Sequence, residues 1–235
     1  MREALALYLV TDFGRFHSRN PDIITLAGRL GRTPGSVALK LTNLAALADS
    51  LPQKGMANAS STDRHVWAEF LADPTAVERS FARQTTPTAA APGLAEAPMQ
   101  FDHRGGARPI LTQARVGQDL FRRTVLTSYR HRCALTGLDD ARLLNASHIV
   151  GWAEAPDQRM WPTNGLCLNA LHDRAFDRHL ISFDHDLRLL ISPRLPDATR
   201  AALERGTTGR LAVPARFHPD PALLAQHREQ FEAQQ

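Results

Sequence analysis

The chain has 235 residues, is 43% hydrophobic and carries a net charge of +4, so it can form one large domain or two small ones. No apolar run approaches the roughly 18 residues of a membrane span, and the N-terminus lacks the pattern of a signal peptide, which predicts a cytoplasmic protein without membrane contact. Two cysteines, Cys133 and Cys167, exclude a disulfide framework and a four-cysteine zinc ribbon.

The first part of the chain predicts helices. Residues 1–16 begin with an apolar and polar alternation that fits a helix or a strand. From Pro21 apolar residues recur at helical spacing, and Gly31 is typical of a helix end. Thr33 and Pro34 then predict the cap and first turn of a second helix.

Two helices joined by a glycine-containing turn match the layout of a helix-turn-helix. In that interpretation Thr33, Ser36 and Lys40 face DNA. An ordinary helical hairpin is the equally open alternative, since residues 1–100 carry almost as many acidic as basic side chains.

A third helix is expected over residues 63–71, capped by Ser61 or Thr62, with Trp67 in the core. Prolines and alanines without apolar periodicity follow and predict a linker. The predicted organisation is a helical domain (1–84), a linker (85–104) and a C-terminal domain (105–235, core 115–193).

Arginines gather upstream of residue 133, with Asp119 as the one acid among them. Arginine binds phosphate oxygens bidentately, so the cluster favours contact with nucleic acid over the alternative of a solvated helix face. The arginines are Arg104, Arg108, Arg115, Arg122, Arg123, Arg130 and Arg132. Apolar residues at four-residue spacing predict a helix over 117–129 in the same region.

Three motifs follow in order: Cys133-Ala-Leu-Thr-Gly, then Ser147-His148-Ile149 after an apolar run, then Asn164-Gly-Leu with Leu171-His172-Asp-Arg-Ala-Phe-Asp177. This pattern resembles the HNH nucleases, whose site is a ββα-metal finger, over roughly residues 108–193. It is closest to the bacterial restriction-like branch, in which a G-Q-x-x-F-R helix, here beginning at Gly117, precedes the first motif.

The resemblance implies a divalent cation, with Mg²⁺ first and Mn²⁺, Ni²⁺ or Zn²⁺ as alternatives, and double-stranded DNA as substrate. By the same resemblance His148 is the general base, Asn164 the residue that ties the loop and orients the imidazole, and His172 the metal ligand. Arg174 joins the predicted phosphate contacts, and a homodimer is open because a double-strand break usually needs two sites.

The residue before the base departs from the family pattern. Many HNH proteins have an aspartate or histidine there that also binds metal, whereas this chain has Ser147, a poor ligand. Asp173 and Asp177 are the nearby residues that could complete the metal shell. Asp177 is the weaker candidate, because it lies about 140° around an ideal helix from His172.

The local patterns predict a strand that leads to His148, and a helix that begins at Asn164 and carries His172. Residues 180–192 predict a hairpin that turns at 184–186, and a last helix is expected over 222–231. The predicted fold is α+β. The predicted function is that of a metal-dependent DNA endonuclease of restriction or phage-defence type. A DNA-binding regulator with a decayed site and an RNA-directed nuclease or toxin are the alternatives.

Overall fold

The computed structural model describes all residues except 49–57, 75–76, 78–110, 152–153, 155–157 and 159. For residues 111–117 it describes the backbone alone. The predicted linker, Arg104, Arg108 and the side chain of Arg115 therefore lie outside the described residues. Helices and two small antiparallel sheets make up the described chain, which confirms the α+β class. Within this part of the chain, no helix has the length and apolar character needed to cross a membrane.

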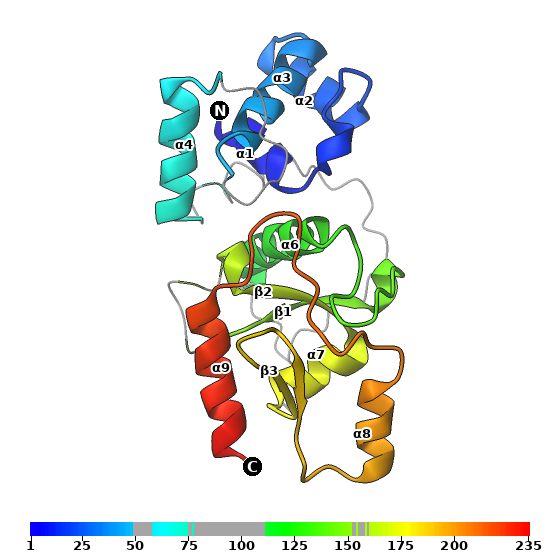
Figure 1. Cartoon of the computed structure of the whole chain (residues 1–235). Coiled ribbons are helices and arrows are strands. Elements are labelled where there is room, and N and C mark those ends of the chain that lie inside the picture. Colours follow the sequence, from blue (N-terminus) through cyan, green and yellow to red (C-terminus); the bar gives the residue numbers. More distant parts are fainter. Residues whose placement is uncertain (49–57, 75–76, 78–110, 152–153, 155–157, 159) are drawn as a thin grey trace, which may run out of the picture.

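The described residues of the N-terminal part, at the top of Figure 1, include the helices α1 (Arg2–Leu9), α2 (Pro21–Leu30), α3 (Pro34–Ala45) and α4 (Ser61–Ala72). The first segment, left open between helix and strand, is thus helical, and a 3₁₀ turn (Phe13–Arg15) follows it.

The ends of these helices follow from single residues. Helix α2 ends where Gly31 adopts a left-handed φ of 60°, and Thr33 caps α3 by accepting a hydrogen bond from the Ser36 amide. Helix α4 begins two residues earlier than predicted, at Ser61. Its cap is Ser60, which forms a capping box with Asp63, so neither Ser61 nor Thr62 is the cap.

The N-terminal core also takes residues from the rest of the chain. Trp67 is 8% exposed and packs in this core as predicted, and Leu120 of α6 belongs to the same cluster. Phe217 stacks on Trp67, with 6.4 Å between the ring centroids. The helical part therefore packs directly on the C-terminal half.

Arg216 joins the two halves from a buried position. The side chain is 3% exposed and donates hydrogen bonds to the carbonyl oxygens of Tyr8 at 2.9 Å and of Leu9 and Thr11 at 3.3 Å. Its guanidinium lies 4.9 Å from the Tyr8 ring centroid. In Figure 1 the segment before α9 passes beside α6 towards the N-terminal helices.

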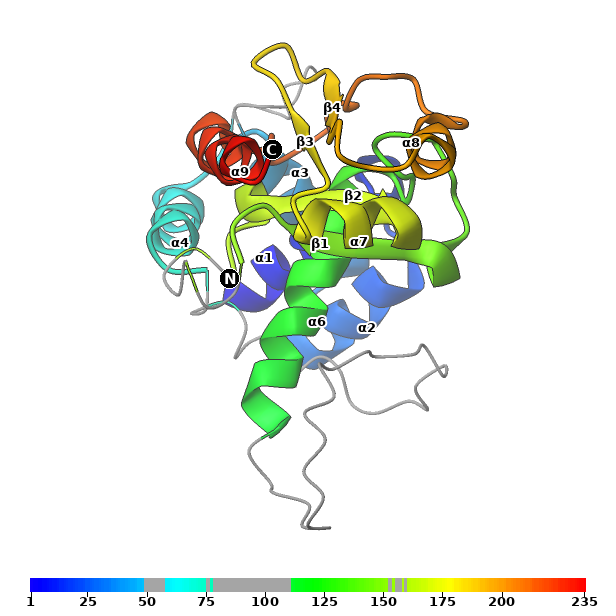
Figure 2. The ribbon, with the colours of Figure 1, turned by 90° about the horizontal axis from the view of Figure 1, so that it is seen from below.

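A two-stranded ribbon between two helices organises the C-terminal half. Strand β1 (Leu144–His148) pairs antiparallel with β2 (Gly165–Asn169), and His148 lies opposite Gly165. Helix α6 (Leu111–Ser128) covers one face and α7 (Ala170–Asp177) the other (Figures 1 and 2).

The prediction that a helix begins at Asn164 is wrong. Residues Pro162–Asn164 form a 3₁₀ turn, β2 follows, and α7 begins only at Ala170, with Asn169 as its cap. The apolar run from Leu166 to Leu168 is fully buried. A short buried run of this kind fits a strand as well as a helix, and pairing with β1 decides for the strand.

The remaining elements pack around this unit. Strands β3 (Ile181–Phe183) and β4 (Leu189–Ile191) form the predicted hairpin, and α9 (Pro221–Ala233) confirms the predicted last helix. Helix α8 (Asp197–Glu204) was not predicted. It lies on the side of α7 opposite α9 in Figure 1.

Candidate active site

Asp173 reaches across from α7 to β1. Its two carboxylate oxygens accept hydrogen bonds from the Ser147 hydroxyl and from Asn145 Nδ2, the latter at 2.7 Å. Asn145 and Ser147 are two residues apart on the strand and so share a face. Asp173 also lies in the first turn of α7, where a carboxylate is favoured by the helix dipole. The residue before the predicted base thus has a carboxylate beside it.

His148 turns to the other face of β1. Its imidazole lies parallel to the ring of Phe121 on α6, with 4.2 Å between centroids and 7° between planes. The side chain is partly exposed, unlike the buried Ser147 beside it. His148 and Asp173 therefore approach the same strand end from its two faces.

Asn164 holds the chain that follows His148. Its backbone oxygen accepts from the Ile149 amide at 3.0 Å, and its buried Oδ1 accepts from the Val150 amide at 2.9 Å. Its Nδ2 donates to the carbonyl oxygens of Val150 at 3.2 Å and Gln158 at 3.4 Å. These bonds tie the loop, which is one of the two tasks predicted for this residue.

His172 is buried and faces α8. Its Nδ1 lies 3.0 Å from Asn169 Oδ1, and its Nε2 lies 2.9 Å from the carbonyl oxygen of Leu203. Only 2% of the residue is exposed. Both ring nitrogens therefore face protein oxygens, and a metal ion bound by either nitrogen would have to displace one of these contacts.

The other predicted carboxylate is turned away from β1. Asp177 is exposed and pairs with Arg174 at 3.3 Å within the same helix. Arg174 also lines a hollow between α7 and α8. Of the two carboxylates proposed to complete the metal shell, Asp173 is the one that contacts the residue before the base.

The predicted arginine set divides by its contacts. Arg122 donates to the Leu144 carbonyl oxygen at 2.7 Å and so braces the start of β1. Arg132 pairs with Asp139 at 3.1 Å, while Arg123 and Arg130 are exposed. The structure therefore gives Arg122 a role in the fold and leaves Arg123 and Arg130 at the surface.

Ser36 and Lys40, the two residues of α3 that were predicted to face DNA, also differ in their exposure and contacts. Ser36 is exposed, whereas Lys40 Nζ lies 3.0 Å from Oδ2 of the buried Asp63. Burial alone would raise the pKa of Asp63, but hydrogen bonds from Ser60 and Lys40 outweigh it and lower the pKa. Lys40 thus neutralises a buried carboxylate, which competes with a contact to DNA.

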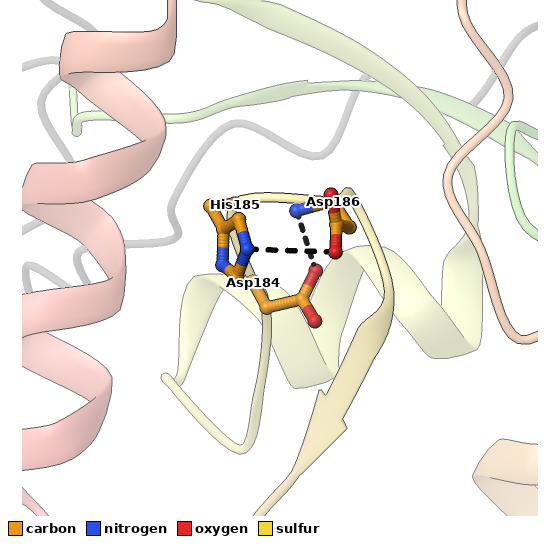
Figure 3. Close-up of side chains that lie close together, drawn as sticks. All are labelled: Asp184, His185 and Asp186. Atoms are coloured by element: carbon orange, nitrogen blue, oxygen red, sulfur yellow. Dashed lines mark hydrogen bonds and ion pairs between the residues drawn. The ribbon is translucent and has the colours of Figure 1, made fainter.

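One group of neighbouring ligand atoms occurs outside the motif pattern. Asp184, His185 and Asp186 lie together at the β3–β4 turn (Figure 3), the one group of three or more such residues in the described part of the chain. Asp184 Oδ1 accepts from the amides of Asp186 at 2.9 Å and Arg188 at 2.7 Å, and the Arg188 amide is the largest cause that lowers the pKa of Asp184. These bonds close the turn, so the group is explained by the hairpin.

Two other titratable groups of the C-terminal half, Cys167 and His227, are buried. Burial raises the pKa of the Cys167 thiol to about 12, and both cysteines are free and buried. Burial likewise lowers the pKa of His227 to about 4. His227 lies 3.0 Å from Ser182 Oγ and 3.0 Å from the Phe176 carbonyl oxygen, a pair of contacts that the sequence did not indicate.

The chain has recognisable relatives in its C-terminal half. Residues 133–184 match the model of the family described as HNH endonuclease. No curated protein is similar enough to count as a match. Among solved structures, one similar chain is described as a modification-dependent TagI restriction endonuclease, with 24% identity and a TM-score of 0.35. The similarity covers 47% of this chain and 36% of that one, so this chain spans about a third of that protein.

Proposed function

Because residues 133–184 form an HNH endonuclease domain, we propose that the protein is a metal-dependent endonuclease that hydrolyses the phosphodiester bonds of DNA. The observation that carries this proposal is the pairing of Asp173 with Ser147, directly beside His148 at the end of β1. A carboxylate and a histidine at one strand end supply the two kinds of group that metal-assisted hydrolysis requires.

His148 is the proposed general base. A neutral imidazole can take a proton from water near pH 7, and the partial exposure of this side chain gives water access to it. Asn164 fixes the backbone of the two residues that follow, so the base sits on an anchored strand end. His148 would hold the proton that the attacking water loses.

Asp173 is the proposed metal ligand, in place of His172. One carboxylate, supplemented by water and phosphate oxygens, is how Mg²⁺ is commonly held, and the hard oxygens of Asp173 and Ser147 fit this ion or Mn²⁺. When bound, the ion would stabilise charge on the phosphate and the leaving oxygen. Zn²⁺ fits less well, because Cys133 and Cys167 are buried as packing residues and His172 is engaged with α8.

The placement of these groups on opposite faces of β1 suits the reaction. In-line displacement puts the attacking and the leaving oxygen on opposite sides of phosphorus. A base from the α6 face and an acidic ligand from the α7 face can serve these two oxygens separately when the phosphate lies beyond the end of β1, where both side chains can reach it. This division of roles also accounts for Ser147, because Asp173 supplies the carboxylate that the strand lacks.

The substrate and the setting rest on the motif resemblance. We propose double-stranded DNA cleaved in restriction or phage defence, with two copies acting together for a double-strand break. The exposed Arg123, Arg130 and Ser36 are the proposed contacts to DNA that the surface leaves accessible. None of these three contacts implies a particular recognition sequence.

A regulator with a decayed site is the alternative that Ser147 favours. A plasmid-cleavage assay with wild type and His148→Ala separates the two functions. Each protein is incubated with supercoiled plasmid in Mg²⁺, Mn²⁺ or EDTA, and the plasmid is either modified or unmodified DNA. If the protein is an endonuclease, only the wild type should nick the plasmid, and only when a metal ion is present. Both proteins should bind DNA equally. Tight DNA binding by wild type without cleavage under any ion would favour the regulator, and cleavage of RNA alone would favour the toxin.

A further inference from the structure

We infer that Phe121 is a positioning residue for His148, and that Gly165 is the residue that lets it take this place. The inference rests on the proposed function, since positioning matters only if His148 reacts. Phe121 belongs to α6, upstream of the segment that matches the family model.

The contact between the two rings is a parallel stack. At 4.2 Å between centroids and 7° between planes, Phe121 covers one face of the imidazole and fixes the plane of the ring. The nitrogen lone pair of an imidazole lies in that plane and so is not covered by a stack on the face. A stack can therefore hold the ring without using the nitrogen that must accept the proton.

Gly165 allows α6 to come close enough for this stack. It is the residue opposite His148 in the β1–β2 register. A Cβ at this position would lie 2.9 Å from Phe121 Cζ and closer still to Val125 Cγ2. Any larger residue at 165 would therefore push against the Val125 and Phe121 side chains of α6 and disturb the stack on His148.

The backbone and the ring of His148 are thus held by different residues. Asn164 bonds to the backbone of Ile149 and Val150, which fixes where β1 ends. Phe121 limits rotation of the side chain itself. Phe121 is only 3% exposed and is also a core residue, so the test must separate positioning from packing.

The variant Phe121→Leu keeps an apolar side chain but removes the ring. Phe183→Leu is the matched control, because Phe183 lies in the same core cluster and its ring packs at a tilt of 39° against Phe176 rather than against His148. Proton NMR reports the stack directly, since the carbon-bound ring protons of His148 are shifted upfield above a phenyl ring. Their signals are assigned by their absence in His148→Gln.

We expect the upfield shift in wild type and Phe183→Leu and its loss in Phe121→Leu. The single-turnover rate constant at saturating enzyme should fall about 10- to 100-fold for Phe121→Leu, with the half-saturating enzyme concentration unchanged, and less than about threefold for Phe183→Leu. Equal losses in the two variants, or unshifted His148 protons in wild type, would overturn the inference. Shifted protons in a wild type that cleaves no substrate would overturn the proposed function and leave the ring geometry confirmed.

A second pair of variants tests the part played by Gly165. Gly165→Ala should diminish the upfield shift and the cleavage rate together, because its methyl group pushes against the Val125 and Phe121 side chains. Adding Val125→Ala removes the atom nearest to that methyl group and should restore part of both. A Gly165→Ala protein with the wild-type shift and rate would show that the glycine has no such role.

Discussion

In the described part of the chain, two histidines lie flat against a phenylalanine, and one of them is the proposed base. His148 stacks on Phe121 and His227 on Phe176, both with 7° between the ring planes. His227 is buried, and each of its nitrogens has a protein partner. His148 is partly exposed at a strand end. The same ring contact therefore holds a structural histidine in one region and a candidate base in the other, and access to solvent distinguishes them.

We propose that His172 belongs with the structural histidine, although its motif resembles a metal ligand. It is 2% exposed and faces Asn169 and Leu203 through its two nitrogens. A histidine in a family motif can thus connect helices while the residue after it, Asp173, faces the strand.

The largest expected effect is the difference in cleavage rate between substitutions of His148 and of His227. His148→Gln should lower the cleavage rate by about 10²- to 10⁴-fold, the usual contribution of a general base, with little change in melting temperature. His227→Gln should instead lower the free energy of unfolding by about 1–3 kcal/mol, because a buried hydrogen-bond network is disturbed, and leave cleavage nearly unchanged. Thermal unfolding and single-turnover cleavage of both variants check this, and the reverse pattern would exchange the two roles.

His172→Gln should behave like His227→Gln rather than like His148→Gln. Loss of the contacts to Asn169 and Leu203 is expected to lower the free energy of unfolding by about 1–3 kcal/mol. Cleavage at saturating Mg²⁺ should stay within about tenfold of wild type. Urea unfolding and a metal titration measure the two effects, and a folded variant that needs far more metal would restore His172 as the ligand.

The pH dependence of stability should come from His227. Burial lowers its pKa to about 4, whereas an unfolded histidine titrates near 6.5. The unfolded chain therefore binds this proton first, so the contribution to stability is complete above about pH 6.5 and is lost as the pH falls towards 4. The loss should approach about 3 kcal/mol. Urea unfolding across this range should show a flatter curve for His227→Gln than for the exposed control His185→Gln.

The smallest expected effect concerns the exposed arginines. Arg130→Ala should weaken DNA binding by a few-fold and reduce its salt dependence by about one phosphate contact, with kcat unchanged. Arg122→Ala should act mainly on stability, because Arg122 braces Leu144 at the start of β1. Binding titrations at several salt concentrations distinguish the two, and equal salt slopes for wild type and Arg130→Ala would remove Arg130 from the interface.

Local signals in the sequence predicted the features that depend on single residues. Gly31, the Thr33 cap and the turn at 184–186 lie where they were expected, because helix ends and tight turns are set by nearby backbone needs. Strand β1 also leads to His148 as predicted.

The errors occur where distant residues decide the structure. The start of α7 at Ala170 depends on pairing of β2 with β1, which no local pattern in the run from Leu166 to Leu168 reveals. The orientation of His172 depends on α8, which was not predicted. Asp173 was among the candidates, but its contact with Ser147 selects it.

The most direct test of the account removes one carboxylate from each side of α7. Asp173→Asn and Asp177→Asn change the same charge on the same helix, and only Asp173 faces β1. Single-turnover plasmid cleavage is measured for both during titration with Mg²⁺. The account predicts a loss of at least about 100-fold for Asp173→Asn, or a much higher metal requirement, with Asp177→Asn close to wild type. A folded Asp173→Asn protein that cleaves at the wild-type rate and metal concentration would contradict it.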